Sequence, residues 1–130
     1  MKIVERKKLS NPAGVSLLLS KLLVDASAKA IAGQSSDGSF SWMDGVADEL
    51  DGETLSDVMS KAANESDSID WDTTAGGVRR ASFDFDSENL LLYLFTESDF
   101  VLAAITPKSL SAVDVDRKVT AILPNLRDFL

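Results

Sequence analysis

The sequence "ENLLLYLFTESDFVLAAI", residues 88–105, is the most apolar part of this chain. Each of its two hydrophobic runs is about six residues long, far short of the roughly twenty that a membrane-spanning helix needs. The polar break Thr96–Asp99 is typical of a tight turn, and the aromatic and β-branched residues on either side favour strands. The stretch therefore predicts a β-hairpin formed by Leu90 to Thr96 and Asp99 to Thr106.

Both predicted strands are apolar on both faces, so both faces of their sheet have to be covered. Two further segments predict strands of the same sheet. In residues 28–43, "AKAIAGQSSDGSFSWM", the side chains alternate in character from one residue to the next, which predicts two strands. Asp37-Gly38 between them is a strong signal for a two-residue hairpin turn. The alanines of the first strand indicate that another element packs closely against the sheet. In "VRRASFDFD", residues 78–86, Ala81, Phe83 and Phe85 share one face, which predicts a half-exposed strand.

Helical spacing predicts what covers the sheet. Asn11 can cap a helix that starts at Pro12 and continues to Asp25. A second helix is predicted by acidic residues that come early and Lys61 that comes late, as the helix dipole favours, and by apolar residues at helical spacing: Leu50, Leu55, Val58, Met59, Ala62 and Ala63. Gly52 weakens its start, so that its regular part is expected to begin near Glu53.

The last helix is expected between Ser109 and Leu130. Pro124 lies inside its apolar stripe, and proline removes a backbone hydrogen bond. The sequence therefore predicts a bend near Thr120 to Leu123, or a short break there. Residues 66–80 are polar and contain glycine, and we interpret them as a loop. Residues 12–130 are predicted to form a single domain behind a basic tail, residues 1–11.

Composition excludes several functions. The chain has 130 residues, a net charge of −8 and neither cysteine nor histidine. Disulfides, cysteine-based metal sites and a histidine general base are excluded. Nucleic-acid binding needs positive potential, and a short basic run near the start (Lys2, Arg6, Lys7 and Lys8) is more typical of a solvated tail. The acidic balance favours a basic partner surface. No secretory signal or membrane-inserting segment is visible, so we expect a cytoplasmic protein.

No catalytic signature, cofactor motif or metal-ligand set stands out. The carboxylate pairs Asp84/Asp86 and Asp114/Asp116 are better explained as solvated acids than as metal ligands. Arg79-Arg80-Ala81-Ser82 could be a kinase site, or either arginine could reach a partner's phosphates, but an exposed strand face explains them more simply.

Two further features have a structural and a functional interpretation. Gly76-Gly77 could cradle a phosphate, but a flexible loop before a strand suffices. Trp42, Met43 and Trp71 could be exposed and anchor a partner. Burial in the core is favoured for Trp42, whereas the position of Trp71 stays open.

The predicted order is helix, two strands, helix, three strands, helix. Over Pro12 to Leu130, this order resembles the Roadblock family of dynein light chains and their bacterial and archaeal relatives. The pieces that carry the resemblance are the "AKAIAGQSSDGSFSW" hairpin, the acidic second helix, the "LLLYLFTESDFVLAAIT" hairpin and the final amphipathic helix. The alanine-rich first strand and Pro124 depart from the family pattern.

The resemblance implies an α+β, roadblock/profilin-like fold: a five-stranded antiparallel sheet with one helix on one face and two on the other. It also implies a homodimer in which the third strand pairs with its twin and the second helices pack together. Carried onto this chain, the dimer interface comprises Leu55, Val58, Met59, Ala62, Arg80, Ala81, Phe83 and Phe85. The alternative that Phe83 and Phe85 are ordinary monomer core stays open.

The resemblance implies a non-catalytic dimeric module that binds and modulates a small Ras-like GTPase, or a complex containing one. Any effect on GTP hydrolysis would come from repositioning the GTPase's own switch regions. A purely structural scaffold subunit and a small-ligand sensor domain are the alternatives. Because fold does not fix function, all three rest on analogy.

Overall fold

The computed structural model describes residues 11–35, 38–74, 78–95 and 100–130. Its elements follow one another in an order that contains every predicted helix and strand: α1 (Pro12–Asp25), β1 (Ala30–Ser35), β2 (Ser41–Gly45), α2 (Gly52–Asn64), η1 (Ser66–Ser68), β3 (Asp72–Thr73), β4 (Arg79–Asp84), β5 (Glu88–Phe95), β6 (Phe100–Pro107) and α3 (Ala112–Phe129).

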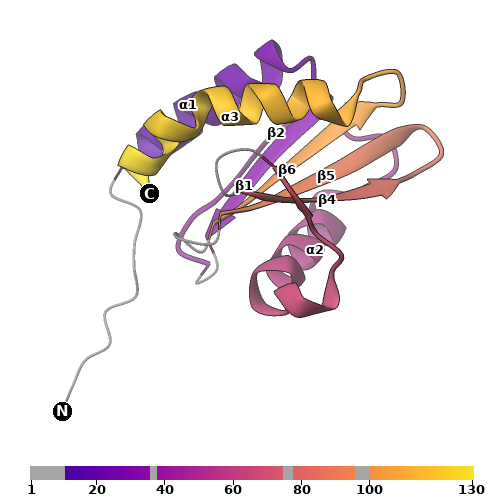
Figure 1. Ribbon diagram of the computed structural model, residues 1–130, viewed down its shortest axis with the longest axis horizontal. Helices are drawn as coiled ribbons and strands as arrows, with labels where there is room; N and C mark the ends of the chain where they lie inside the picture. The colour runs from indigo at the N-terminus through magenta and orange to yellow at the C-terminus, as the bar shows by residue number, and fades with distance from the viewer. Residues whose placement is uncertain (1–10, 36–37, 75–77, 96–99) are drawn as a thin grey trace.

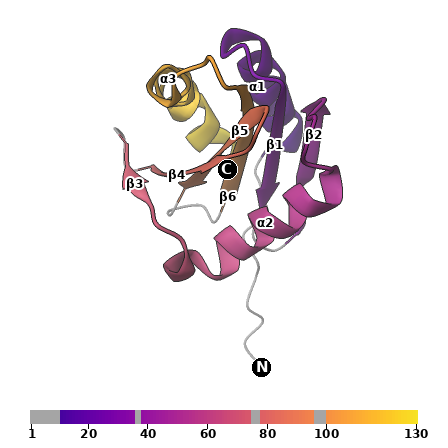
Figure 2. The same ribbon diagram turned by 90° about the vertical axis from the view of Figure 1, so that its right-hand side faces the viewer.

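The strands form one antiparallel sheet in the order β2-β1-β6-β5-β4-β3. The apolar stretch that opened the sequence analysis makes its two central strands, paired in the register Leu92↔Ala103. The predicted hairpin is therefore confirmed, although the break at residues 96–99 lies outside the described residues. Helices α1 and α3 lie together on one face of the sheet and α2 lies alone on the other (Figures 1 and 2).

The sheet has six strands, and our prediction of five is wrong. The additional strand is β3, which lies within the stretch that we interpreted as a loop and pairs only Asp72 with Arg80 and Thr73 with Arg79. A strand of two residues is too short to show an alternating pattern, which explains why the sequence did not indicate it.

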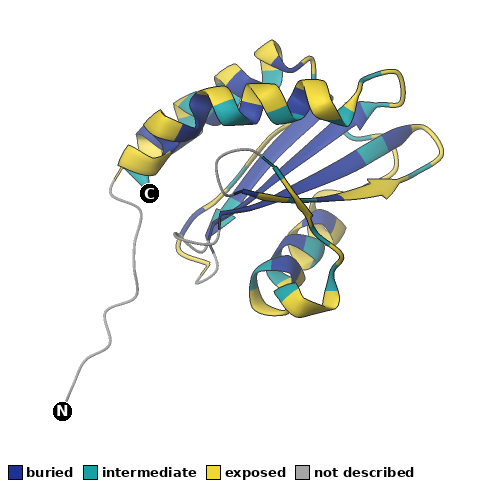
Figure 3. Cartoon of the chain, in the orientation of Figure 1, coloured by how far each residue is buried: buried dark blue, intermediate teal, exposed yellow. Residues whose placement is uncertain are grey.

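Strand alternation divides the core into two layers. On β5, Leu90, Leu92 and Leu94 pack toward α2, whereas Leu91, Tyr93 and Phe95 pack toward α1 and α3. The two central strands are almost entirely buried (Figure 3). Ala30, Ala32, Ala81 and Ala103 all lie in the α2 layer. Their short side chains agree with the prediction that something packs closely against the sheet there.

Local chemistry explains where the first two helices begin. The Asn11 side chain accepts a hydrogen bond from the Gly14 N–H at 2.9 Å, and the Asp51 side chain accepts one from the Thr54 N–H at 2.7 Å. In both cases the cap provides an acceptor for an otherwise unpaired N–H. Between β1 and β2, the register Gln34↔Ser41 centres the connection on Asp37 and Gly38. Gly38 has a φ of 77°, as the turn requires, whereas Asp37 lies outside the described residues.

Helix α3 runs without a break from Ala112 through Pro124 to Phe129. Of the two outcomes that we predicted, the short break is therefore wrong, and the bend stays a prediction. Val119, Ile122, Leu123 and Leu126 are buried against the sheet, and Pro124 is on the exposed side. Water can satisfy the carbonyl that proline leaves without a donor there, and the buried stripe holds the helix together. Among the described residues, no helix is long and apolar enough to cross a bilayer.

Replacing Pro124 by alanine is expected to raise the free energy of unfolding by about 1–3 kcal/mol, because proline is disfavoured in a helix interior and the site is exposed. Urea denaturation followed by circular dichroism measures the change. As a control, Ala121→Gly, at another exposed position of α3, should lower stability by about 1 kcal/mol. A less stable Pro124→Ala variant would contradict this description of the helix.

Candidate functional site

The outer edge of β4 is only partly paired. Strand β5 pairs with β4 along its inner side, from Arg79↔Leu94 to Asp84↔Asn89. On the outer side, β3 pairs only with Arg79 and Arg80. Within the part of the chain that the structure describes, the backbone from Ala81 to Asp84 has no strand partner on this side. Such an edge presents backbone donors and acceptors to another chain.

Apolar side chains surround this open backbone on the α2 side. Phe83 is 37% exposed, so it is not ordinary monomer core. Phe85, Ile69 and Trp71 are partly buried against the core layer below α2. The Trp71 indole N–H donates to the Ser66 carbonyl at 2.8 Å, which fixes its ring. We define the open-edge surface as Phe83, Phe85, Ile69 and Trp71 together with the backbone of residues 81–84.

The structure separates the predicted dimer residues into two groups. Leu55, Met59, Ala62 and Ala81 are at most 2% exposed within a single chain. Side chains already buried in the monomer add no area to an interface, so they can only support one. Those with surface to offer are Val58, Arg80, Phe83 and Phe85. The interface itself stays a prediction.

Arg80 points to the opposite face of the sheet from Phe83, toward α3. Its Nε lies 3.1 Å from Oδ1 of Asp116, and its guanidinium donates to the Ser82 hydroxyl at 2.7 Å. The Tyr93 hydroxyl donates to the same Asp116 oxygen at 2.7 Å. Burial first, and then the Asp116 carboxylate, raise the pKa of Tyr93 well above its usual range. Tyr93 therefore remains a neutral donor.

This arrangement bears on two sequence hypotheses. Arg80 is held inside its own chain by Asp116, which does not favour its use as an arginine finger. Ser82 is exposed, but its hydroxyl already accepts from Arg80. Arg79 is exposed and remains available.

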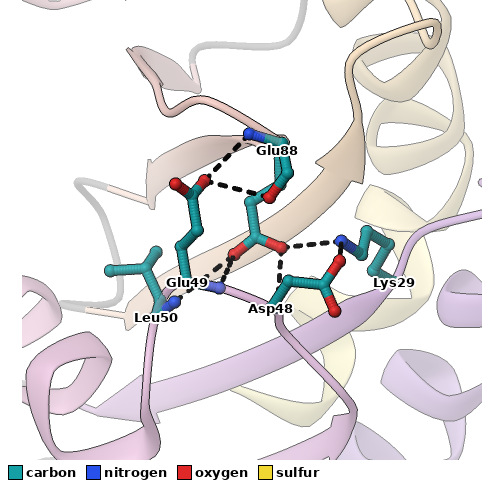
Figure 4. A network of polar contacts seen from close by, with 6 residues as sticks. Lys29, Asp48, Glu49, Leu50 and Glu88 are labelled. Atoms are coloured by element: carbon teal, nitrogen blue, oxygen red, sulfur yellow. Dashed lines mark hydrogen bonds and ion pairs between the residues drawn. The ribbon is translucent and has the colours of Figure 1, made fainter.

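Glu88, the first residue of β5, is a buried carboxylate that the sequence did not indicate as a site. The Glu88 side chain has no exposed surface and lies 2.8 Å from the Lys29 ammonium. Its oxygens also accept from the backbone N–H groups of Asp48, Glu49 and Leu50 at 2.8, 3.0 and 3.4 Å (Figure 4). Lys29 also pairs with Asp48. Glu88 thus fixes the segment before α2 to the end of the sheet.

The hydrogen bonds around Glu88 change its ionisation. Desolvation is the largest single effect and raises its pKa, but the Lys29 hydrogen bond and the three backbone N–H groups together outweigh it. The pKa falls from 4.5 to about 2. The ammonium of Lys29 has a raised pKa, first because of its hydrogen bond to Asp48 and then because of Glu88. The sequence signal that could have indicated this ion pair is the position of Glu88 at the start of an otherwise apolar strand.

The remaining candidates do not form a catalytic or metal site. Asp84 and Asp86 are exposed near the end of β4, far along the sheet from Asp116, and Asp114 and Asp116 point in different directions because they lie two residues apart on a helix. Among the described residues, no group of three acidic side chains could hold a metal ion. Trp42 is partly buried under α1, and Met43 is 40% exposed. Gly76 and Gly77 lie outside the described residues.

Charge is distributed unevenly over the molecule. Residues 44–72, which include α2, carry ten acidic side chains and one lysine, a formal charge of −9 in a chain whose total is −8. All ten are exposed. The α2 side of the sheet is therefore strongly negative, whereas the rest of the molecule is close to neutral. Such a field attracts basic partner surfaces.

Comparison with known proteins identifies the fold. No protein-family model and no curated protein matches the sequence. Among solved structures, Myxococcus xanthus MglB superposes with a TM-score of 0.64 at 12% identity, covering 89% of this chain and 93% of that one. MglC from Myxococcus xanthus gives 0.56 at 16% identity, covering 90% and 99%. A Roadblock/LC7 domain from Streptomyces avermitilis gives 0.51 at 20% identity, covering 86% and 97%. At such identities the likeness concerns the fold alone.

Proposed function

From the Roadblock/LC7 fold of this chain, we propose that it is a non-catalytic, dimeric interaction module that binds and modulates a small Ras-like GTPase or a complex containing one. The observation that supports the proposal most is the open edge of β4 with the exposed ring of Phe83 beside it. The resemblance of the sequence to Roadblock domains provides the functional class.

The proposed dimer joins two copies through β4. The unpaired backbone of residues 81–84 gains strand partners from its twin, and Phe83 and Phe85 become buried between the copies. Val58 extends this contact on the side of α2, while Leu55, Met59 and Ala62 hold α2 on the sheet. Strand β3 limits the contact, because it already pairs with Arg79 and Arg80.

The GTPase would contact the composite surface that the two copies form. The negative potential of the α2 side favours a basic partner surface and steers its approach. Modulation would act by shifting the switch regions of the GTPase between populations.

Replacing Phe83 by glutamate tests the dimer. The substitution places a charge where the proposed contact is apolar, so the dimer dissociation constant should rise at least about tenfold. Analytical ultracentrifugation measures it, and the circular dichroism spectrum should stay close to wild type, because the ring is already partly exposed and the fold of one chain does not need it. Val24→Glu on the outer face of α1, where the side chain is 75% exposed, is the matched control. Equal dissociation constants for the two variants would argue against a contact at β4.

The GTPase proposal is tested by mixing the chain with a purified Ras-like GTPase from the same organism. The wild-type chain should bind it and change its rate of GTP hydrolysis, and Phe83→Glu should weaken the effect. Binding without any change in rate would favour the scaffold alternative. No binding to such a GTPase would count against the proposal.

A further inference from the structure

We propose that the groove between α3 and the β3–β4 corner binds a small molecule that carries an oxyanion, a phosphate or a carboxylate group. The groove is open to solvent and has a volume of about 360 Å³, within the size range of small-ligand sites. In Figure 2, β3 and β4 lie at the margin of the sheet, with α3 on one side of it. The residues that form the groove and enter the argument are Thr73, Arg80, Val113, Asp116, Arg117 and Thr120.

The floor of the groove contains the guanidinium of Arg80, which is ion-paired with Asp116 and keeps 16% of its side chain exposed. The Nε–H of Arg80 is buried and forms no hydrogen bond among the described residues. Asp116 is 3.1 Å away, but the alignment is too poor for a hydrogen bond, and its Oδ1 already accepts from Tyr93. A ligand oxyanion in the groove would therefore contact the exposed part of the guanidinium, and Asp116 keeps the group in place.

The charge of the residues that line the groove favours an anionic ligand over a cationic one. The residues that line the groove include two arginines and one aspartate, a formal charge of +1 in a chain of −8. Asp72 and Asp114 lie 3.9 Å from Arg80 and Arg117. Both carboxylates are more than half exposed, so that water screens them. A cation would find Asp116 already engaged by Tyr93 and Arg80.

Other residues fit the rest of such a ligand. Arg117 is 77% exposed on α3 and can close over a bound oxyanion with a second guanidinium. The Thr120 hydroxyl donates to the Asp116 carbonyl at 2.8 Å, and the exposed Thr73 adds a further hydroxyl. Val113, 53% exposed, offers an apolar surface to a carbon portion.

This site does not depend on the proposed dimer. Arg80 and Phe83 lie on opposite faces of β4, so the groove opens toward α3, whereas the open-edge surface lies on the side of α2.

Nuclear magnetic resonance titration of the full-length, ¹⁵N-labelled chain tests the inference. Inorganic phosphate and acetate are added separately, with sodium chloride at matched ionic strength as the reference. Saturable shifts of the backbone amides of residues 73, 80, 117 and 120 with phosphate or acetate, but not with chloride, are expected. The anion that binds more tightly identifies the head group. Shifts that do not saturate, or that scatter over the surface, would overturn the proposal.

A pair of variants separates a specific site from general charge. Arg117→Gln should weaken binding at least about tenfold, because it removes charge-assisted hydrogen bonds. Lys118→Gln makes the same change of charge at the next position, is exposed and does not line the groove, so it should leave the affinity unchanged. Equal losses in the two variants would reduce the effect to electrostatic screening and overturn the proposal.

Discussion

Replacing Glu88 by glutamine should lower the free energy of unfolding by about 3 kcal/mol, the loss typical of breaking a buried charge pair. The amide keeps the shape of the side chain but removes the charge that Lys29 and the N–H groups of Asp48, Glu49 and Leu50 all contact. Those donors would remain buried with weaker acceptors. Urea denaturation at neutral pH measures the loss.

Glu49→Gln is the matched control for this experiment. Glu49 lies in the same network and accepts from the backbone and hydroxyl of Ser87, but its side chain is exposed. Its loss should be under about 1 kcal/mol, because water replaces the lost acceptor. If both variants lost the same stability, the burial of Glu88 would not be what matters.

The same carboxylate makes stability depend on pH. Its pKa is about 2 in the folded chain and 4.5 as the ordinary value. Because the folded value is the lower one, the stabilisation from Glu88 is complete above about pH 4.5 and is lost as the pH falls toward 2. Wild type should therefore lose stability over this interval more steeply than Glu88→Gln. Parallel curves for the two proteins would contradict the assignment.

Replacing Gly45 by alanine should also cost several kcal/mol, roughly 2–4 from the two effects combined. Gly45 has a φ of 93°, and a Cβ there would lie 2.2 Å from the carbonyl oxygen of Lys29 and 2.7 Å from Cα of Ala30. Ala30 begins β1 and pairs with Gly45, and Lys29 directly precedes it, so these backbone atoms cannot yield without disturbing the ladder.

Gly38→Ala measures the backbone strain alone, so that its difference from Gly45→Ala gives the steric part of the cost. Gly38 also has a positive φ, 77°, but an added Cβ would meet nothing within 4 Å. It should cost about 1–2 kcal/mol from backbone strain alone. Chemical denaturation of the two variants gives the difference directly. Equal losses would mean that the contact with Lys29 carries no energy.

The sequence predicted those parts of the fold whose signals are local. The cap at Asn11 and the proline after it gave the start of α1 correctly, and the two apolar runs on either side of a polar break predicted the central strands. Strand β3 was missed because two residues show no periodicity. The sequence left a bend and a break of α3 as alternatives, because proline opposes a helix locally while the buried stripe around it favours one through tertiary packing.

The candidate sites were harder to predict because their partners are distant in sequence. Glu88 contacts residues 38 to 40 positions before it, and Tyr93 meets Asp116 from another element 23 positions away. Only the assembled fold shows that Phe83 is exposed while Ala81, two residues before it, is buried. The division of the predicted interface into supporting and exposed residues depends on the same information.

The most direct test of the account is the molar mass of the wild-type chain, measured by size-exclusion chromatography with multi-angle light scattering over a series of concentrations. If two copies join at β4, the mass should reach twice the chain value of 14.0 kDa and fall toward that value on dilution or with Phe83→Glu. A mass of one chain throughout the series would contradict the dimer, and with it the composite surface proposed for the GTPase.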